Sequence, residues 1–223
     1  MNYPHIKDNV EQIQHRIHEA AIRVGRDADS VQLLPVTKTV DLDVVLDLYE
    51  LGFRAMGENR IHIAEAKITQ APSNIHWHMI GSIQRRKVMD VVRLFDRIDS
   101  IDRLELAQEL EKRCAEAEKS VEMLLQVNVS GEDVKHGFSP KVLSDTLNTV
   151  QSCPHLTVVG LMTMAPQEAD ESEIRAVFSG LKLLADDNGL GVLSMGMTND
   201  FEIAIEEGAT EIRIGTALFK ERE

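Results

Sequence analysis

Residues 190–216 read LGVLSMGMTNDFEIAIEEGATEIRIGT and contain the unit from which the rest of the chain is built. Two short apolar runs, at 190–194 and 210–214, are joined by a helix-like segment at 198–207. Short aliphatic runs that alternate with single helical segments are typical of parallel strands joined by crossover helices. The stretch therefore predicts a strand–helix–strand unit.

The same unit recurs along the sequence. We expect strands at 31–37, 53–56, 75–80, 94–98, 121–129, 156–162, 190–194 and 210–214. Helices are expected at 41–51, 60–70, 83–93, 102–118, 139–151, 168–187 and 198–207, with a short tail after Gly215. Eight such units predict an α/β fold of the (β/α)8 TIM-barrel type with short loops. An open doubly wound sheet is the alternative, but its GxGxxG fingerprint does not follow the first strand.

An additional helix is expected before the barrel. Apolar residues recur at helical spacing over 6–24, and Gly25 offers a natural helix end. We therefore expect residues 1–25 to form a helix that packs on the barrel. No linker or low-complexity segment divides the chain, so residues 1–223 are expected to form a single domain.

Composition excludes several classes of function. The chain has 24 basic and 37 acidic residues, a net charge of −13, which argues against nucleic-acid binding. No apolar stretch is long enough to cross a bilayer, and the charged N-terminus does not resemble a signal peptide. The two cysteines, Cys114 and Cys153, lack CxxC spacing and predict neither a metal site nor a disulfide. We expect a cytoplasmic protein without a membrane partner.

Lys38 is the most informative single residue. The active sites of such barrels lie at the carboxyl ends of the strands, and Lys38 ends the first expected strand. A strand buried on both faces would partly desolvate this amine and leave it nucleophilic, which is the condition for Schiff-base formation. The alternative, favoured by position alone, is a lysine that reaches into solvent.

The last two strand ends predict a phosphate site. They carry SMGMTND at 194–200 and IGT at 214–216, and phosphate sites of such barrels often follow the seventh and eighth strands. Glycine permits close backbone approach, and a helix that begins near Thr198 would direct free N–H groups at an anion. Alternatively, Thr198 is only a helix cap and Gly215 only a turn residue.

Three other positions carry candidate chemistry. Arg213, inside the last strand, needs an acceptor, which could be a pyridine nitrogen or a structural carboxylate. An arginine that faces a pyridine nitrogen would keep it unprotonated and restrain carbanion chemistry. His76 and His78 share one strand face, but a zinc site lacks further ligands nearby, so no metal is expected. Lys135 lies in a polar loop where it could recruit an anion or be simply solvated.

Seven segments together resemble the pyridoxal phosphate homeostasis protein family, which is similar to the N-terminal barrel of alanine racemases. They are VTKT (36–39), GENR (57–60), IHWHMIGSIQRRK (75–87), SGEDVKHGF (130–138), GLMTM (160–164), SMGMTNDFEIAI (194–205) and RIGTALF (213–219). The resemblance implies that pyridoxal 5'-phosphate (PLP) is the cofactor, that Lys38 forms the internal aldimine and that Arg213 faces the pyridine nitrogen. It also implies that Asn59 and His78 line the ring, and that the phosphate is held by Ser194, Met195, Thr198, Gly215 and Thr216.

The resemblance further implies a monomer that acts in intracellular PLP (vitamin B6) homeostasis, without robust catalysis, and that delivers the cofactor to PLP-dependent apo-enzymes. The alternative is a fold-type III racemase or lyase. Racemases take a second acid/base from a C-terminal domain, and this sequence ends shortly after the eighth expected strand. A Schiff-base aldolase for sugar phosphates is a third possibility. Arg60, Arg86 and the Thr198-Asn199 pair depart from the family pattern. These departures concern the entrance of the implied pocket and leave Lys38 and Arg213 unchanged.

Overall fold

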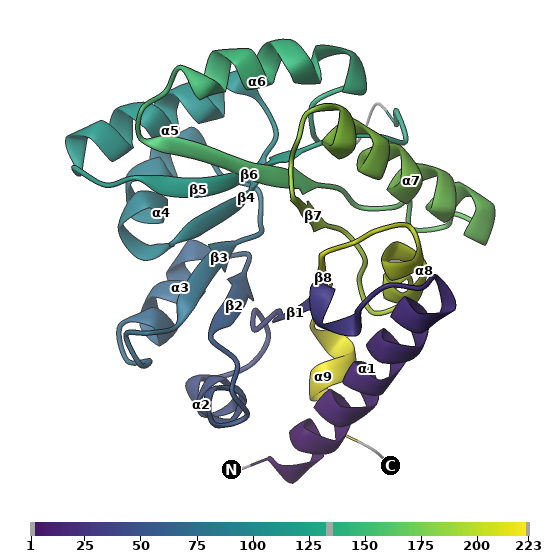
Figure 1. Ribbon diagram of the computed structural model, residues 1–223. Helices are drawn as coiled ribbons and strands as arrows, with labels where there is room; N and C mark the ends of the chain where they lie inside the picture. Colours follow the sequence, from purple (N-terminus) through teal and green to yellow (C-terminus); the bar gives the residue numbers. More distant parts are fainter. Residues whose placement is uncertain (1–2, 133–135, 222–223) are drawn as a thin grey trace.

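A computed structural model describes residues 3–132 and 136–221. Eight parallel strands form one sheet in the order β1-β8-β7-β6-β5-β4-β3-β2 (Figure 1). The strands are β1 (Gln32–Pro35), β2 (Ala55–Glu58), β3 (His76–Met79), β4 (Arg97–Ile101), β5 (Val121–Gln126), β6 (Leu156–Met162), β7 (Val192–Ser194) and β8 (Glu211–Ile214).

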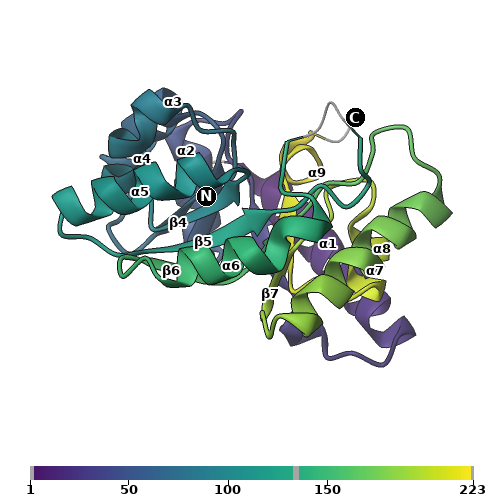
Figure 2. The same ribbon diagram turned by 90° about the horizontal axis from the view of Figure 1, so that it is seen from above.

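Helices connect the strands and cover the outside of the sheet. They are α1 (Pro4–Arg23), α2 (Leu42–Glu50), α3 (Ile61–Ile68), α4 (Val88–Leu94), α5 (Leu104–Glu116), α6 (Leu143–Gln151), α7 (Glu171–Asp187), α8 (Phe201–Glu206) and α9 (Thr216–Phe219). Short 3-10 turns occur at Ala28–Ser30, Arg85–Lys87 and Pro140–Val142. Seen from above, α3, α4 and α5 lie on one side of the strands, and α7 and α8 lie on the other (Figure 2). No described helix is long and apolar enough to cross a membrane.

The sheet closes on itself between β1 and β2. Val36 forms a parallel bridge with Gly57, and the Thr37 amide donates a hydrogen bond of 3.0 Å to the Gly57 carbonyl. A side chain at position 57 would be crowded, because a Cβ there would lie 3.3 Å from Leu34 Cδ2. The nearly closed barrel confirms the predicted (β/α)8 TIM-type fold.

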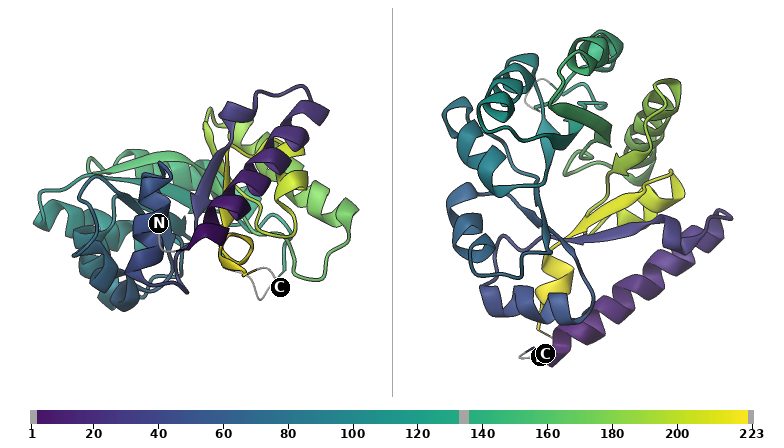
Figure 3. Two further views of the ribbon diagram at one scale, coloured as in Figure 1. Left: turned by 90° about the horizontal axis from the view of Figure 1, so that it is seen from below. Right: turned by 60° about the vertical axis from the view of Figure 1, so that its left-hand side comes forward.

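The predicted N-terminal helix is also confirmed. It lies beside α8 and α9, so the two ends of the described chain pack on the same side of the barrel (Figures 1 and 3). Ile6, Val10 and Ile13 on its inner face are buried. The Asn9 side chain donates hydrogen bonds of 3.0 Å each to the carbonyls of Leu218 and Lys220. These bonds tie α1 to the segment that follows β8.

Several predicted boundaries are wrong by three residues or more, among them the start of α4 at Val88 instead of 83, and two of these errors have a clear physical reason. The fourth strand, predicted at 94–98, is Arg97–Ile101, because its inward-facing residues are charged rather than apolar. The last crossover helix, predicted to begin near Thr198, begins at Phe201. The Asp200 carboxylate accepts the Met197 amide at 2.6 Å and holds the preceding residues in a turn. Thr198 therefore does not cap α8.

Candidate functional site

Lys38 lies in a tight turn at the carboxyl end of β1. The turn spans residues 37–40 and is closed by a hydrogen bond of 3.2 Å from the Val40 amide to the Thr37 carbonyl. Lys38 and Thr39 occupy its two central positions, and both side chains are exposed. The partial burial predicted for Lys38 is therefore not found, because the strand ends before this residue instead of enclosing it.

The ends of β8 and β2 adjoin this turn from its two sides. The Val36 amide donates to the Ile214 carbonyl at 2.8 Å, and a Cβ on Gly215 would lie 3.3 Å from the Val36 carbonyl oxygen. Gly215 and Thr216, which begin α9, thus lie next to the chain that leads into Lys38. Asn59 is half-buried and follows β2 on the other side.

The loop after β7 is joined to β8 by backbone hydrogen bonds. The Met195 amide donates to the Glu211 carbonyl at 3.1 Å, and the Arg213 amide donates to the Gly196 carbonyl at 3.0 Å. Met195 is fully buried, whereas Thr198 is half-buried in the turn before α8. The loop is therefore held beside the Gly215 segment. Its contacts with a phosphate group stay a prediction.

Arg213 is buried inside the barrel beneath these strand ends. Its Nη1 donates to Ser194 Oγ at 2.8 Å, and its Nη2 donates to the Thr163 carbonyl at 3.0 Å. Burial lowers the pKa of Arg213, and the charge of Glu211 opposes that shift. An arginine never loses its proton in proteins, so the side chain places a positive charge and five N–H donors here. Its predicted role opposite a pyridine nitrogen stays a prediction.

Ser194 connects Arg213 to a second ionised group. Its hydroxyl accepts from Arg213 and donates to Glu211 Oε1 at 2.8 Å. Both the hydroxyl and Glu211 are fully enclosed by the barrel. The Ser194 side chain is thus already engaged in the interior, and its predicted phosphate contact stays a prediction.

Below this serine the barrel interior is charged. Arg97 Nη2 contacts Glu211 Oε2 at 2.5 Å, and its Nε and Nη2 donate to the two oxygens of Asp99 at 2.7 and 2.9 Å. Burial lowers the pKa of Arg97, but its bonds with Asp99 and the charge of Glu211 raise it above the ordinary value. Most barrels of this type fill the corresponding layers with branched aliphatic side chains.

His78 faces the same group of charges. Its buried Nδ1 lies 3.7 Å from Asp99 Oδ2 and 3.8 Å from Glu211 Oε2, and it has no hydrogen-bond partner among the described residues. Burial lowers the pKa of His78, so the neutral ring is favoured. Histidine and two carboxylates could ligate a metal ion, but the guanidinium of Arg97 is already paired with both carboxylates.

The structure places His78 on a pocket of about 420 Å³ at the opposite end of the barrel from Lys38. The other residues that line it lie at or near the starts of strands: Gln32, Arg54, Ala55, His76, Asp96, Arg97 and Glu122. Contact between His78 and a ligand ring at the Lys38 end stays a prediction.

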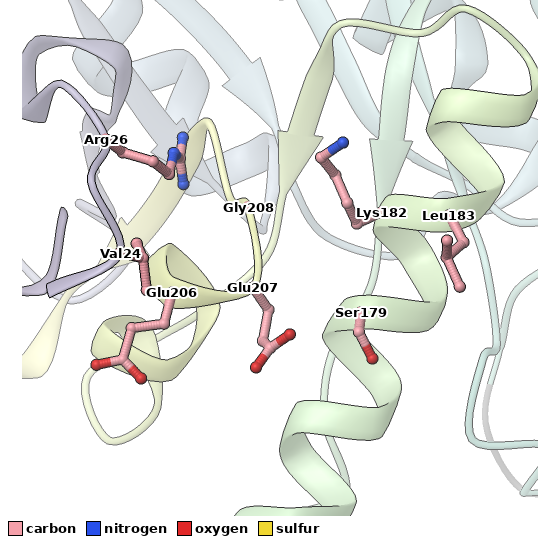
Figure 4. Close-up of a pocket in the computed structure, with 8 residues that line it drawn as sticks. All are labelled: Val24, Arg26, Ser179, Lys182, Leu183, Glu206, Glu207 and Gly208. Atoms are coloured by element: carbon pink, nitrogen blue, oxygen red, sulfur yellow. The ribbon is translucent and has the colours of Figure 1, made fainter.

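A second pocket, of about 380 Å³, lies on the outside of the barrel where the segment after α1 meets α7 and α8 (Figure 4). Its charged groups are paired. Arg26 donates to the carbonyls of Ile205 and Ala209 at 2.6 and 2.8 Å, and Glu206 pairs with Arg175. The pocket is remote from the strand ends that carry the candidate site.

Sequence reasoning singled out Arg213 but missed its charged neighbours Arg97, Asp99 and Glu211, although a signal for them exists. Arg97 and Asp99 alternate along β4, as Glu211 and Arg213 do along β8. Because alternate residues of a strand share a face, such spacing places both charges of each pair on one side of the sheet.

Of the positions that depart from the family pattern, Arg60 and Arg86 are exposed. Lys135 lies outside the described residues.

Comparison with known proteins agrees with this geometry. Residues 3–223 match the family model for the alanine racemase N-terminal domain. The pyridoxal phosphate homeostasis protein of Pseudomonas aeruginosa is 40% identical over 223 residues, which cover 98% of this chain and 96% of that protein. The protein of the same name from Aquifex aeolicus is 36% identical over 96% of this chain and 97% of its own length.

Solved structures show the same relationship. PipY of Synechococcus elongatus, solved with PLP bound, is 33% identical with a TM-score of 0.79, over 93% of this chain and all of that chain. Alanine racemase of Clostridium difficile shares the fold at 13% identity, with a TM-score of 0.76 over 96% of this chain and 57% of that one. Family model and relatives agree along nearly the whole length, and the chain belongs to the pyridoxal phosphate homeostasis protein family, within the alanine racemase N-terminal domain group.

Proposed function

We propose that this protein binds PLP through a Schiff base on Lys38 and serves PLP homeostasis. The observation that carries the proposal is the position of Lys38, in a hydrogen-bonded turn at the carboxyl end of β1 with the start of α9 beside it. Relatives of 36–40% identity are named for PLP homeostasis, and PipY has been solved with PLP bound.

The residues present fit this cofactor. An exposed lysine amine at the barrel mouth is accessible to an aldehyde. Gly215 and Thr216 head α9 with a hydroxyl and backbone N–H groups, since the first turn of any helix leaves N–H groups unpaired. The buried guanidinium of Arg213 would lie toward the ring, and PLP would supply an electron sink there.

We propose that catalysis is weak. Arg213 keeps its proton and cannot donate one readily to a pyridine nitrogen, so a neutral pyridine would remain a poor electron sink.

The alternative function, a racemase or lyase, is favoured by the match to the alanine racemase domain. Exchange of the α-proton of amino acids in heavy water separates the two: exchange no faster than with free PLP supports homeostasis, and faster exchange supports an enzyme.

Visible absorbance tests the cofactor proposal. We expect purified protein to gain a visible band with PLP, borohydride to fix the label on Lys38, and Lys38→Ala to lose both. Lys182→Ala is a matched control, since Lys182 is a surface lysine in an ion pair with Asp186. A protein that stays colourless with added PLP, or a Lys38→Ala variant with full absorbance, would overturn the proposal.

We further propose that the protein is a cytoplasmic monomer that hands PLP to apo-enzymes. This part rests on the family and on the sparse cysteines. The test measures how fast the loaded protein activates a PLP-dependent apo-enzyme in two arrangements. In one the two proteins are mixed, and in the other a dialysis membrane separates them. Faster activation in direct contact supports hand-over, and equal rates would contradict it.

A further inference from the structure

Lys67, on α3, is a buried lysine that contacts the turn containing Lys38. Its side chain is 6% exposed, and its ammonium donates to the carbonyls of Thr37 at 2.6 Å and Val40 at 3.1 Å. These are the first and last residues of the 37–40 turn. Lys67 therefore holds both ends of the segment whose two central residues are Lys38 and Thr39.

Glu58, at the end of β2, completes this arrangement. Its Oε1 pairs with the Lys67 ammonium and also accepts the Thr37 hydroxyl at 2.6 Å. Glu58 is fully buried, and its Oε2 has no hydrogen-bond partner among the described residues. A buried ion pair is weak evidence for stability, because a well-packed apolar pair often serves as well. The pair is better explained by the conformation that it imposes on the 37–40 turn.

The chemistry of the contact is specific to lysine. An ammonium has three N–H donors, and the carbonyls of Thr37 and Val40 and the carboxylate of Glu58 use all three. A methionine has a similar length but no donor. An arginine presents its donors in a planar fork, which does not suit three acceptors grouped around one point.

We propose that Lys67 is the positioning residue of the site: oriented by Glu58, it fixes the backbone of the 37–40 turn and so the place of the Lys38 amine. The consequence for Schiff-base formation rests on the function proposed above. The effect on the turn itself does not, because it concerns hydrogen bonds of the protein alone.

The test uses a double variant, Lys67→Met with Glu58→Gln, in the full-length protein. Lys67→Met alone would leave the Glu58 carboxylate buried without its cation, which strongly destabilises a fold, whereas the double variant removes both charges. Leu147→Ala is the control for general loss of stability. Leu147 is buried on α6, which lies on the side of the barrel away from β1 and β2 (Figure 1).

Two readouts are measured. The first is amide hydrogen exchange at Thr37 and Val40 without cofactor, since both amides are hydrogen-bonded at the turn. We expect faster exchange there in the double variant and not in Leu147→Ala. The second is the rate of Schiff-base formation with added PLP. Displacement of a reacting group by about 1 Å can cost on the order of 100-fold in rate, so we expect a fall of about 10- to 100-fold.

The outcomes are distinct. Faster turn exchange together with slower Schiff-base formation supports the positioning role. Unchanged exchange overturns it, and so does faster exchange with an unchanged Schiff-base rate. If the wild-type protein forms no Schiff base, the proposed function fails. Exchange then decides alone: faster turn exchange upholds the role of Lys67 in fixing the turn, and unchanged exchange overturns it.

Discussion

Nη1 of Arg213 lies 2.8 Å from the hydroxyl of Ser194, and the same hydroxyl donates to Glu211 at 2.8 Å. The buried guanidinium is thus joined to a carboxylate through a neutral group instead of touching it. Ser194 satisfies one donor of Arg213 and leaves its charge only partly compensated. The barrel interior therefore presents a positive group just below the strand ends that surround Lys38.

Ser194→Ala should weaken the fold measurably. The substitution leaves a buried N–H of Arg213 and an oxygen of Glu211 without their partner, at a cost of about 1–3 kcal/mol in the free energy of unfolding. Urea denaturation checks this. Ser144→Ala is the control, because Ser144 is exposed on α6. Equal stability of the Ser194 and Ser144 variants would show that the bond to Arg213 contributes nothing.

Arg97→Met should be far more disruptive than loss of a surface arginine. It leaves Asp99 and Glu211 buried without their shared cation, and breaking a buried pair costs about 3–5 kcal/mol. Arg93→Met is the matched control. Arg93 pairs with Glu65 on the surface, where such pairs are worth below about 1 kcal/mol. Chemical denaturation of both variants measures the difference, and similar losses would contradict the argument.

His78 should make stability depend on pH. Burial lowers its pKa below the ordinary 6.5; Asp99, Glu211 and Asp96 act against this, and Arg97 reinforces it. Because the folded pKa lies below the unfolded one, the unfolded chain binds the extra proton first as pH falls. The contribution of the neutral ring is therefore complete above pH 6.5 and declines as pH falls from 6.5 toward the folded pKa.

The measurement is the free energy of unfolding of the cofactor-free protein at several pH values on either side of 6.5. His78→Gln should show a flatter decline on the acid side than the wild-type protein. His15→Gln, at an exposed position on α1, should keep the wild-type slope. A His78→Gln profile parallel to that of the wild-type protein would rule out His78 as the source.

Gly196→Ala should destabilise the loop after β7. Gly196 has φ +93, and an added Cβ would lie 2.6 Å from Ala204 Cβ. Backbone strain and overpacking together predict a loss of about 1–3 kcal/mol or more in unfolding free energy. Gly189→Ala separates the two effects, because Gly189 also has positive φ, +65, but an added Cβ would meet nothing within 4 Å. Thermal denaturation should therefore give Gly196→Ala a clearly lower melting temperature than Gly189→Ala.

The sequence predicted the fold because its units are local. Each unit pairs a short aliphatic run with an amphipathic helix, and eight of these have few ways to pack. The errors arose where tertiary contacts override local pattern. The fourth strand was placed three residues too early, since its charged inner face hides the strand signal. The start of α8 was missed because an Asp200 side chain, not Thr198, organises the preceding turn.

The site was predictable in part for the same reason. Strand ends can be read from the sequence, so the neighbourhood of Lys38 and Gly215 followed from barrel topology. The interaction of Lys67 with the 37–40 turn did not, because it joins residues 27–30 positions apart through backbone carbonyls. Such acceptors are present in every residue and leave no mark in the side-chain pattern.

The closure of the barrel has a mechanical consequence. β1 pairs with β8 over four residues, whereas one backbone bridge joins it to β2 among the described residues. The remaining links across this seam are made by side chains, because the Thr37 hydroxyl and the Lys67 ammonium both bind Glu58 at the end of β2. Closure of the barrel at this seam therefore depends on side chains as well as on the backbone, so substitutions at Glu58 or Lys67 act on the closure of the sheet and on the Lys38 turn together.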